Sequence, residues 1–196
     1  MWKCGKHLNR NGHTMLIQKI HHVAYRCIDA KRTVEWYEKY LGMKYLLAFA
    51  ENTVPSTKAP DPYMHVFLDA GQGSVLAFFE LPTRPVMDRD RNTPTWVQHL
   101  AFEVDSIDTL MATKARLEAD GIEVIGPTDH TLFKSIYFFD PNGHRLELAA
   151  NLATPEMLQK LDDVKWAMLE EWSITKRAAK HADWLHNASA SRAAAR

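Results

Sequence analysis

The segment SIYFFDPNGHRLELAA, residues 135–150, predicts a β-hairpin whose second strand carries a single acidic residue. The turn residues DPNG separate two runs that are rich in aromatic and aliphatic side chains. Glu147 lies in the second run, between two leucines. Because an unpaired carboxylate is costly to bury, we expect Glu147 to be protonated, paired with a cation or bound to a metal ion.

A weak internal repeat relates this half of the chain to the half that precedes it. The run IHHVAYRC, residues 20–27, resembles VQHLAFEV, residues 97–104, and the alignment places His22 over His99. Both runs alternate in polarity, as strands with one buried face do. We therefore expect the two histidines on equivalent faces of equivalent strands.

A predicted helix and three short strands follow each repeated run. The helices show apolar residues at helical spacing and end near Gly42 and Gly121. The strands are expected near residues 44–49, 63–69 and 74–80 and near residues 123–126, 135–139 and 144–150. The predicted fold class is α+β, with two βαβββ modules near residues 17–81 and 95–150. Because modules of this size are only marginally stable alone, we expect the two to share one interface. Together they are expected to form a cupped mixed sheet in a domain spanning residues 16–150.

Composition excludes several classes of partner. The 24 Lys and Arg residues balance 24 Asp and Glu residues, so no basic patch favours nucleic acid binding. No apolar run reaches the roughly 18 residues that a membrane-spanning helix needs. The two cysteines, Cys4 and Cys27, do not form a disulfide framework, and we expect a cytoplasmic protein.

The two ends of the chain differ in their predicted order. Residues 1–15 are expected to form a flexible leader, and residues 187–196 a disordered tail. The pattern of residues 151–186 predicts a helical extension, with Thr154 as N-cap and Pro155 at the first helical position. Its apolar stripe favours packing on its own domain or on a second subunit, which would make a homo-oligomer.

A candidate metal site emerges when the two hairpins are aligned on their turn glycines. The alignment places Ala77 opposite Glu147, so only the second module has a carboxylate there. His22, His99 and Glu147 then form a set of two histidines and one carboxylate on three converging strands. This set occupies one face of an octahedral divalent metal and leaves positions open for substrate and oxygen. Such a metal ion, at the centre of the cupped sheet, would keep Glu147 ionised.

These residue types also have roles that involve no metal. A lone histidine in a strand is more often a hydrogen-bonded structural residue than a metal ligand. Glu80 is the main competing ligand, but it lies three positions past Ala77, so on a regular strand it faces the other way.

The paired modules and the runs HHVAYRC, QHLAFEV and YFFDPNGHRLEL resemble the vicinal oxygen chelate superfamily over about residues 17–150. That superfamily includes glyoxalase I, bleomycin-resistance proteins, epimerases and type I extradiol dioxygenases. The similarity is greatest to small one-domain extradiol enzymes such as biphenyl-2,3-diol 1,2-dioxygenase. Glyoxalases and epimerases generally use a fourth ligand at the position that Ala77 occupies here.

The resemblance implies a ring-cleaving dioxygenase that acts on a catechol-type, 2,3-dihydroxybiphenyl-like diol with O2. Fe(II), or alternatively Mn(II) or another divalent metal, would be held by His22, His99 and Glu147. His130 and Tyr137 match a histidine and a tyrosine that face the substrate in extradiol enzymes. The larger enzymes also carry a histidine that acts as acid–base in oxygen activation, and His65 is a candidate to replace it.

Two other functions remain open from the sequence. A metal-dependent isomerase of the glyoxalase or epimerase type would use the metal to polarise a carbonyl group. The lost carboxylate at Ala77 argues against it. A small-molecule binding or resistance protein would need no metal, and the complete set of two histidines and one glutamate argues against that function.

Overall fold

The computed structural model describes most of the chain as two compact units. The described residues are 19–85, 87–88, 91–177 and 184. Met1–Arg89 form the first unit and Asp90–Arg196 the second. The leader and the tail predicted from the sequence lie outside the described residues.

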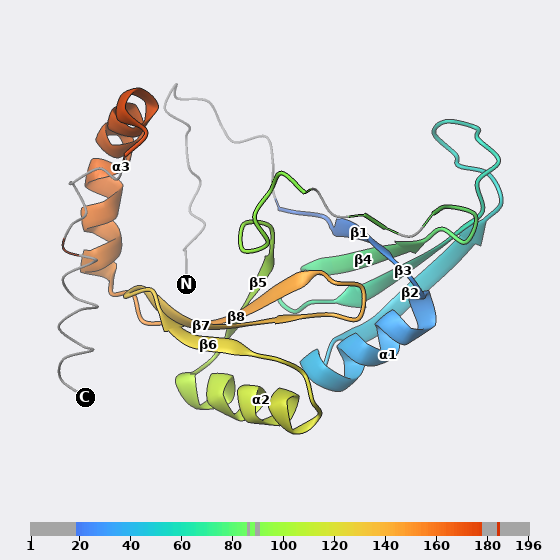
Figure 1. Cartoon of the computed structure of the whole chain (residues 1–196), viewed down its shortest axis with the longest axis horizontal. Helices are drawn as coiled ribbons and strands as arrows, with labels where there is room; N and C mark the ends of the chain where they lie inside the picture. The colour runs from blue at the N-terminus through green and yellow to red at the C-terminus, as the bar shows by residue number, and fades with distance from the viewer. Residues whose placement is uncertain (1–18, 86, 89–90, 178–183, 185–196) are drawn as a thin grey trace. The chain divides into compact units, whose positions relative to one another are not determined.

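The first unit contains one mixed sheet and one helix. Its elements are β1 (Val23–Cys27), α1 (Ala30–Leu41), β2 (Lys44–Glu51), β3 (Tyr63–Asp69) and β4 (Val75–Glu80). The strand order is β1-β4-β3-β2, with β1 parallel to β4 and the other neighbours antiparallel (Figure 1). Helix α1 begins where the Asp29 side chain accepts the N–H of Arg32, and it ends at Gly42 with φ of 65°.

The second unit repeats this arrangement. Its elements are β5 (Leu100–Val104), α2 (Ile107–Ala119), β6 (Ile125–Asp129), β7 (Phe133–Phe139) and β8 (Arg145–Asn151), followed by α3 (Pro155–Thr175). The strand order is β5-β8-β7-β6, and only β5 and β8 are parallel. The α+β class, the two βαβββ modules and the C-terminal helix predicted from the sequence are thus confirmed.

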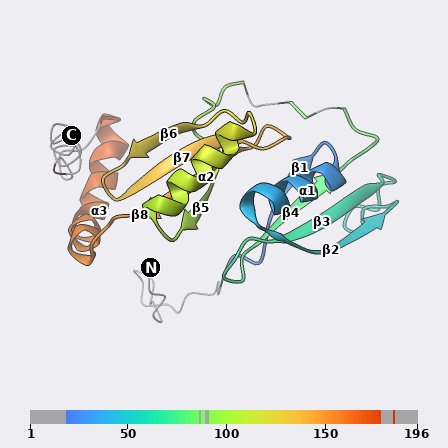
Figure 2. The same cartoon turned by 90° about the horizontal axis from the view of Figure 1, so that it is seen from below.

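Each sheet is covered on one face by its own helix, as Figure 2 shows. In the first unit the ring of Tyr37 on α1 packs 5.1 Å from that of Phe78 on β4. In the second unit α2 contacts β7 and β8, and Leu110 of α2 and Ile136 of β7 are fully buried. Because side chains alternate along a strand, the neighbouring odd-numbered residues of β4 and β7 face away from the helix.

Strand β6 lies a few residues beyond its predicted position at residues 123–126. Gly126 has φ of 110°, and a Cβ there would lie 2.6 Å from the backbone oxygen of Ser135. This close approach bends the strand, and the pairing shifts register between Ile125 and Thr128. Pro127 is tolerated because β6 is an edge strand. The sequence prediction ended at the glycine, which here lies inside the strand.

Helix α3 begins as predicted, with the Thr154 hydroxyl accepting the N–H of Met157 and Pro155 in the first turn. None of its residues is buried, and the large side chains of Trp166 and Trp172 are about half exposed at 48% and 49%. Packing of this helix on a second subunit therefore stays a prediction. Within the described residues, no helix is both long enough and apolar enough to cross a membrane.

Candidate functional site

The hairpin of β7 and β8 brings the predicted tyrosine and glutamate together. In its turn, Asp140 accepts the backbone N–H groups of Asn142 and His144 at 2.9 and 2.8 Å. These bonds fix the turn as an Asx-type turn and set the register of the two strands. Tyr137 consequently lies directly opposite Glu147, as the spacing in the sequence predicted.

The Glu147 carboxylate is buried, with only 3% of the residue exposed. One oxygen, Oε1, accepts the hydroxyl groups of Ser135 and of Tyr137, the latter at 3.2 Å. The other oxygen, Oε2, lies 2.9 Å from Nε2 of His99. Among the described residues no lysine or arginine forms an ion pair with Glu147. The protein therefore holds this carboxylate with two hydroxyls and one imidazole.

The contact between His99 and Glu147 fits a divalent metal. Nδ1 of His99 lies 3.1 Å from the carbonyl oxygen of Val97, which can only accept, so Nδ1 carries the proton. Nε2 of a neutral His99 is then an acceptor facing a carboxylate oxygen, and this pair needs a proton or a cation between its atoms. Adjacent ligands about 2.1 Å from a metal lie about 3 Å apart, close to the spacing observed. A backbone carbonyl on the second nitrogen is also typical of metal-binding histidines.

A hydrogen-bonded chain leads from His130 to Glu147. Nε2 of His130 lies 2.8 Å from the Tyr137 hydroxyl. Since that hydroxyl donates to Glu147, it accepts from His130, whose Nε2 must carry a proton. Burial, and next the negative charge of Glu147, raise the pKa of Tyr137. Tyr137 is therefore a neutral phenol at physiological pH and has a proton to give.

Two further polar residues of this face were missed in the sequence. Ser135 contacts Glu147, and the guanidinium carbon of Arg145 lies 4.3 Å from the centre of the Tyr137 ring. Each lies two residues from Tyr137 or Glu147 on the same strand. The alternation of side chains along a strand was therefore the signal that could have identified both.

The first unit has the equivalent hairpin without the carboxylate. Ala77 on β4 lies opposite Phe67 on β3, as Glu147 lies opposite Tyr137 in the second unit. This register confirms the alignment made from the turn glycines. A methyl group and a phenyl ring thus replace the acid and the phenol.

His65 takes the first-unit position that Ser135 holds in the second. Its ring lies between Phe67 and Phe79, with ring centres 4.1 and 3.5 Å away. The residue is 5% exposed, and Nε2 has no hydrogen-bond partner among the described residues. Burial, and next the nearby His22, lower the pKa of His65 to about 4. The acid–base role suggested for His65 stays a prediction.

His22 lies in the first unit, just before β1. It is exposed, its Nδ1 is 2.8 Å from Nδ1 of His21, and its ring centre is 6.2 Å from that of His65. Across the part of the chain that the structure describes, no three His, Cys, Asp or Glu side chains are grouped to hold a metal ion. His99 and Glu147 are thus the two predicted ligands brought together, and the participation of His22 stays a prediction.

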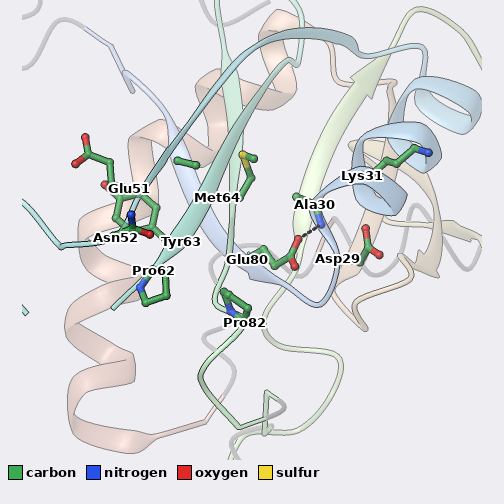
Figure 3. A pocket seen from close by; sticks show the side chains of 11 residues that line it. Asp29, Ala30, Lys31, Glu51, Asn52, Pro62, Tyr63, Met64, Glu80 and Pro82 are labelled. Carbon is green, nitrogen blue, oxygen red and sulfur yellow. Dashed lines mark hydrogen bonds between the residues drawn. The ribbon is translucent and has the colours of Figure 1, made fainter. Parts of the chain in front are cut away.

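A pocket of about 500 Å³ lies in the first unit at the N-terminus of α1 (Figure 3). Its lining includes Asp29, Lys31, Glu51, Tyr63, Glu80 and Pro82. The Glu80 carboxylate accepts the N–H of Ala30 at 2.7 Å, as the dashed line in Figure 3 marks. Glu80 therefore stabilises the helix start and does not share a face with Ala77, as the sequence predicted.

Comparisons with known proteins agree with the motifs in the sequence. The family model "Glyoxalase/Bleomycin resistance protein/Dioxygenase superfamily" matches residues 19–148. A Bacillus subtilis (strain 168) protein named "Putative ring-cleaving dioxygenase MhqA" is 27% identical over 141 residues. That match covers 70% of this chain and 42% of the relative, so the chain spans less than half of the relative's length.

Solved structures share the fold. A glyoxalase family protein from Enterococcus faecalis is 29% identical, with a TM-score of 0.51 over 69% of this chain and 99% of the other. Glyoxalase I of Leishmania major has a TM-score of 0.52 over 80% of this chain and 99% of the other; at 20% identity it supports the fold alone. With the family model spanning residues 19–148, the chain belongs to the glyoxalase/bleomycin resistance protein/dioxygenase superfamily.

Proposed function

We propose that the protein is a ring-cleaving extradiol dioxygenase that acts on a catechol-type diol with O2 and a divalent metal, Fe(II) or alternatively Mn(II). The observation that carries this proposal is the chain from His130 through Tyr137 to Glu147, beside His99. It combines two metal-binding groups with a neutral phenol that has a proton to give. The relative named as a ring-cleaving dioxygenase supports the same reaction class.

The metal would be held by His99 and Glu147, with His22 as the proposed third ligand. When bound, it would bring the diol and oxygen together and accept electron density from the diol. Ser135 and Tyr137 both donate to Oε1 of Glu147, which leaves Oε2 directed toward His99. These two hydroxyls therefore orient the carboxylate as a ligand.

Tyr137 and His130 would handle the proton and the substrate oxygens. The Tyr137 hydroxyl would give its proton to a substrate oxygen and so assist ketonisation of the diol. As that proton moves, negative charge builds on the phenol oxygen, 2.8 Å from Nε2 of His130. The Nε2–H of His130 stabilises this charge, and the same N–H can bind a substrate oxygen directly.

The competing functions fit specific observations less well. An isomerase of the glyoxalase type needs a carboxylate at the position of Ala77, which is fully buried and offers only a methyl group. In a metal-free binding protein, a proton on Nε2 of His99 would hold the pair with Oε2 of Glu147, and the two histidines and the glutamate would have no common role.

The test is anaerobic purification with metal analysis, followed by an oxygen-electrode assay with 2,3-dihydroxybiphenyl and catechol. We expect a bound divalent metal, oxygen uptake and a coloured ring-fission product. Glu147→Ala should lose both metal and oxygen uptake. Tyr137→Phe should keep the metal and lose roughly 100-fold in rate, because proton transfer by a positioned side chain contributes about that much. Tyr63→Phe, a buried tyrosine of the first unit, is the matched control and should keep the rate.

Two outcomes would overturn the proposal. Bound metal with no oxygen uptake on either diol would favour the isomerase. Absence of any divalent metal from the purified protein would leave a small-molecule binding protein.

A further inference from the structure

Arg145, the first residue of β8, lies on the face of the sheet that carries Tyr137 and Glu147, and the proposed mechanism does not use it. It stands on β8 two residues before Glu147, so both side chains project from the same face of the sheet. Its guanidinium carbon is 4.3 Å from the centre of the Tyr137 ring, a cation–π contact. Arg145 thus lies against the ring whose hydroxyl contacts both His130 and Glu147.

The charge of Arg145 has no carboxylate partner among the described residues. Its Nε is buried without a hydrogen bond, and it belongs to none of the ion pairs of this unit. Lys134, on the neighbouring strand, lies 3.9 Å from Asp129 and so has its counter-charge. Glu147 is the nearest carboxylate along the strand, but its oxygens are taken by Ser135, Tyr137 and His99. A buried N–H without a hydrogen bond costs stability, and the terminal nitrogens of Arg145 are not among the buried unpaired atoms, so they are open to a ligand.

The chemistry of the guanidinium specifies the kind of ligand. Its N–H groups form a planar fork that matches the two oxygens of a carboxylate, and the contact with the Tyr137 ring uses none of them. A metal held by Glu147 would neutralise that carboxylate, and the positive charge of Arg145 would remain uncompensated. Arg145 and Glu147 are two positions apart on the strand, which is about 7 Å, and an aromatic ring with groups at opposite ends can bridge that span.

We propose that Arg145 binds a carboxylate substituent on the aromatic diol, so that the protein selects anionic diols over neutral ones. This inference rests on the proposed function for the identity of the diol. The site itself depends only on Arg145, Tyr137 and the face of β7 and β8 that they share.

The experiment compares two ligands that differ only in charge, 3,4-dihydroxybenzoate and 3,4-dihydroxybenzamide. Their dissociation constants for the full chain, with its metal as purified, are measured anaerobically by titration calorimetry. We expect the benzoate to bind at least about tenfold more tightly than the amide, as for truncation of a charge-assisted pair. Arg145→Gln should remove this preference and leave the affinity for the amide within about twofold.

Two further variants keep the result decisive. Lys134→Gln makes the same change in net charge on the adjacent strand and should retain the preference, which excludes a general electrostatic effect. Arg145→Lys keeps the charge without the planar fork and should retain part of it. If Arg145→Gln does not fold, the wild-type ratio and the ratio in Arg145→Lys still decide the question.

Equal binding of the two ligands by the wild-type protein would overturn the inference. So would a preference that survives in Arg145→Gln. Selective binding of the benzoate without oxygen uptake on any diol would refute the proposed function and leave the recognition site intact. Oxygen uptake with equal binding of the two ligands would support the proposed function and refute the recognition site at Arg145.

Discussion

Replacing His65 with phenylalanine should stabilise the protein. His65 is 5% exposed, and its Nε2 has no hydrogen-bond partner among the described residues. The flat ring lies between Phe67 and Phe79, so a phenyl group can keep both ring contacts. His65→Phe therefore removes an unsatisfied polar atom and retains most of the packing.

The magnitude follows from the unsatisfied nitrogen. A buried polar group without a partner costs about 1–3 kcal/mol, and the slightly larger phenyl ring returns part of that gain. We expect the free energy of unfolding to rise by about 1 kcal/mol near pH 7.5, or roughly 2–4 °C in melting temperature.

The effect should grow as the pH falls. Burial lowers the pKa of His65 from 6.5 to about 4, so between these values the unfolded chain binds a proton that the folded chain does not. The wild-type protein consequently loses stability as the pH falls from 6.5 toward 4, by up to about 3 kcal/mol, and His65→Phe is spared this loss. The advantage of the variant is therefore larger at pH 5 than at pH 7.5.

The assay is urea denaturation of the metal-free protein, followed by circular dichroism at pH 7.5 and pH 5. His130→Phe is the matched control, because Nε2 of His130 does have a partner, the Tyr137 hydroxyl at 2.8 Å. That variant should be destabilised by about 1 kcal/mol. If His65→Phe were less stable than the wild type at both pH values, Nε2 would have a partner and the reasoning would be refuted.

Three other changes follow from contacts of single residues. Ser135→Ala removes one of the two hydroxyls on Glu147 and should weaken metal binding by about tenfold in a competition titration; unchanged affinity would contradict the orienting role. Gly126→Ala places a Cβ 2.6 Å from a backbone oxygen at φ of 110° and should cost more than about 2 kcal/mol in thermal unfolding, whereas Gly121→Ala, with open space, should cost about 1 kcal/mol. Glu80→Gln should leave the metal content unchanged, since Glu80 contacts the start of α1; loss of metal would make it a ligand.

The sequence predicted the parts of the fold that depend on local pattern. The repeat, the helix ends and the pairing of Tyr137 with Glu147 follow from periodicity and turn residues, and all of them are observed. The predicted range of β6 ended too early, because the prediction placed the strand end at Gly126, which in fact lies inside a bent edge strand. Ser135 and Arg145 follow from the alternation of side chains along β7 and β8, but neither belongs to the metal-ligand motif.

The unsatisfied nitrogen of His65 could not be predicted from the sequence. Whether a buried nitrogen finds a hydrogen-bond partner depends on tertiary packing and not on the local sequence pattern. The missing bond becomes intelligible when the two modules are compared. In the second unit Ser135 donates to the carboxylate of Glu147. In the first unit His65 takes the place of Ser135, but Ala77 takes the place of Glu147 and offers no carboxylate. Residue 65 therefore has no carboxylate to hydrogen-bond, yet it is a histidine whose unpaired nitrogen lowers the stability of the fold.

Residues that lower stability and have no structural role are typical of functional sites. Measuring oxygen uptake on His65→Phe beside its stability therefore separates two explanations. A more stable variant with reduced uptake would assign His65 a role in the reaction, as its neighbour His22 suggests. A more stable variant with full uptake would make His65 a remnant of the duplication that takes no part in the reaction.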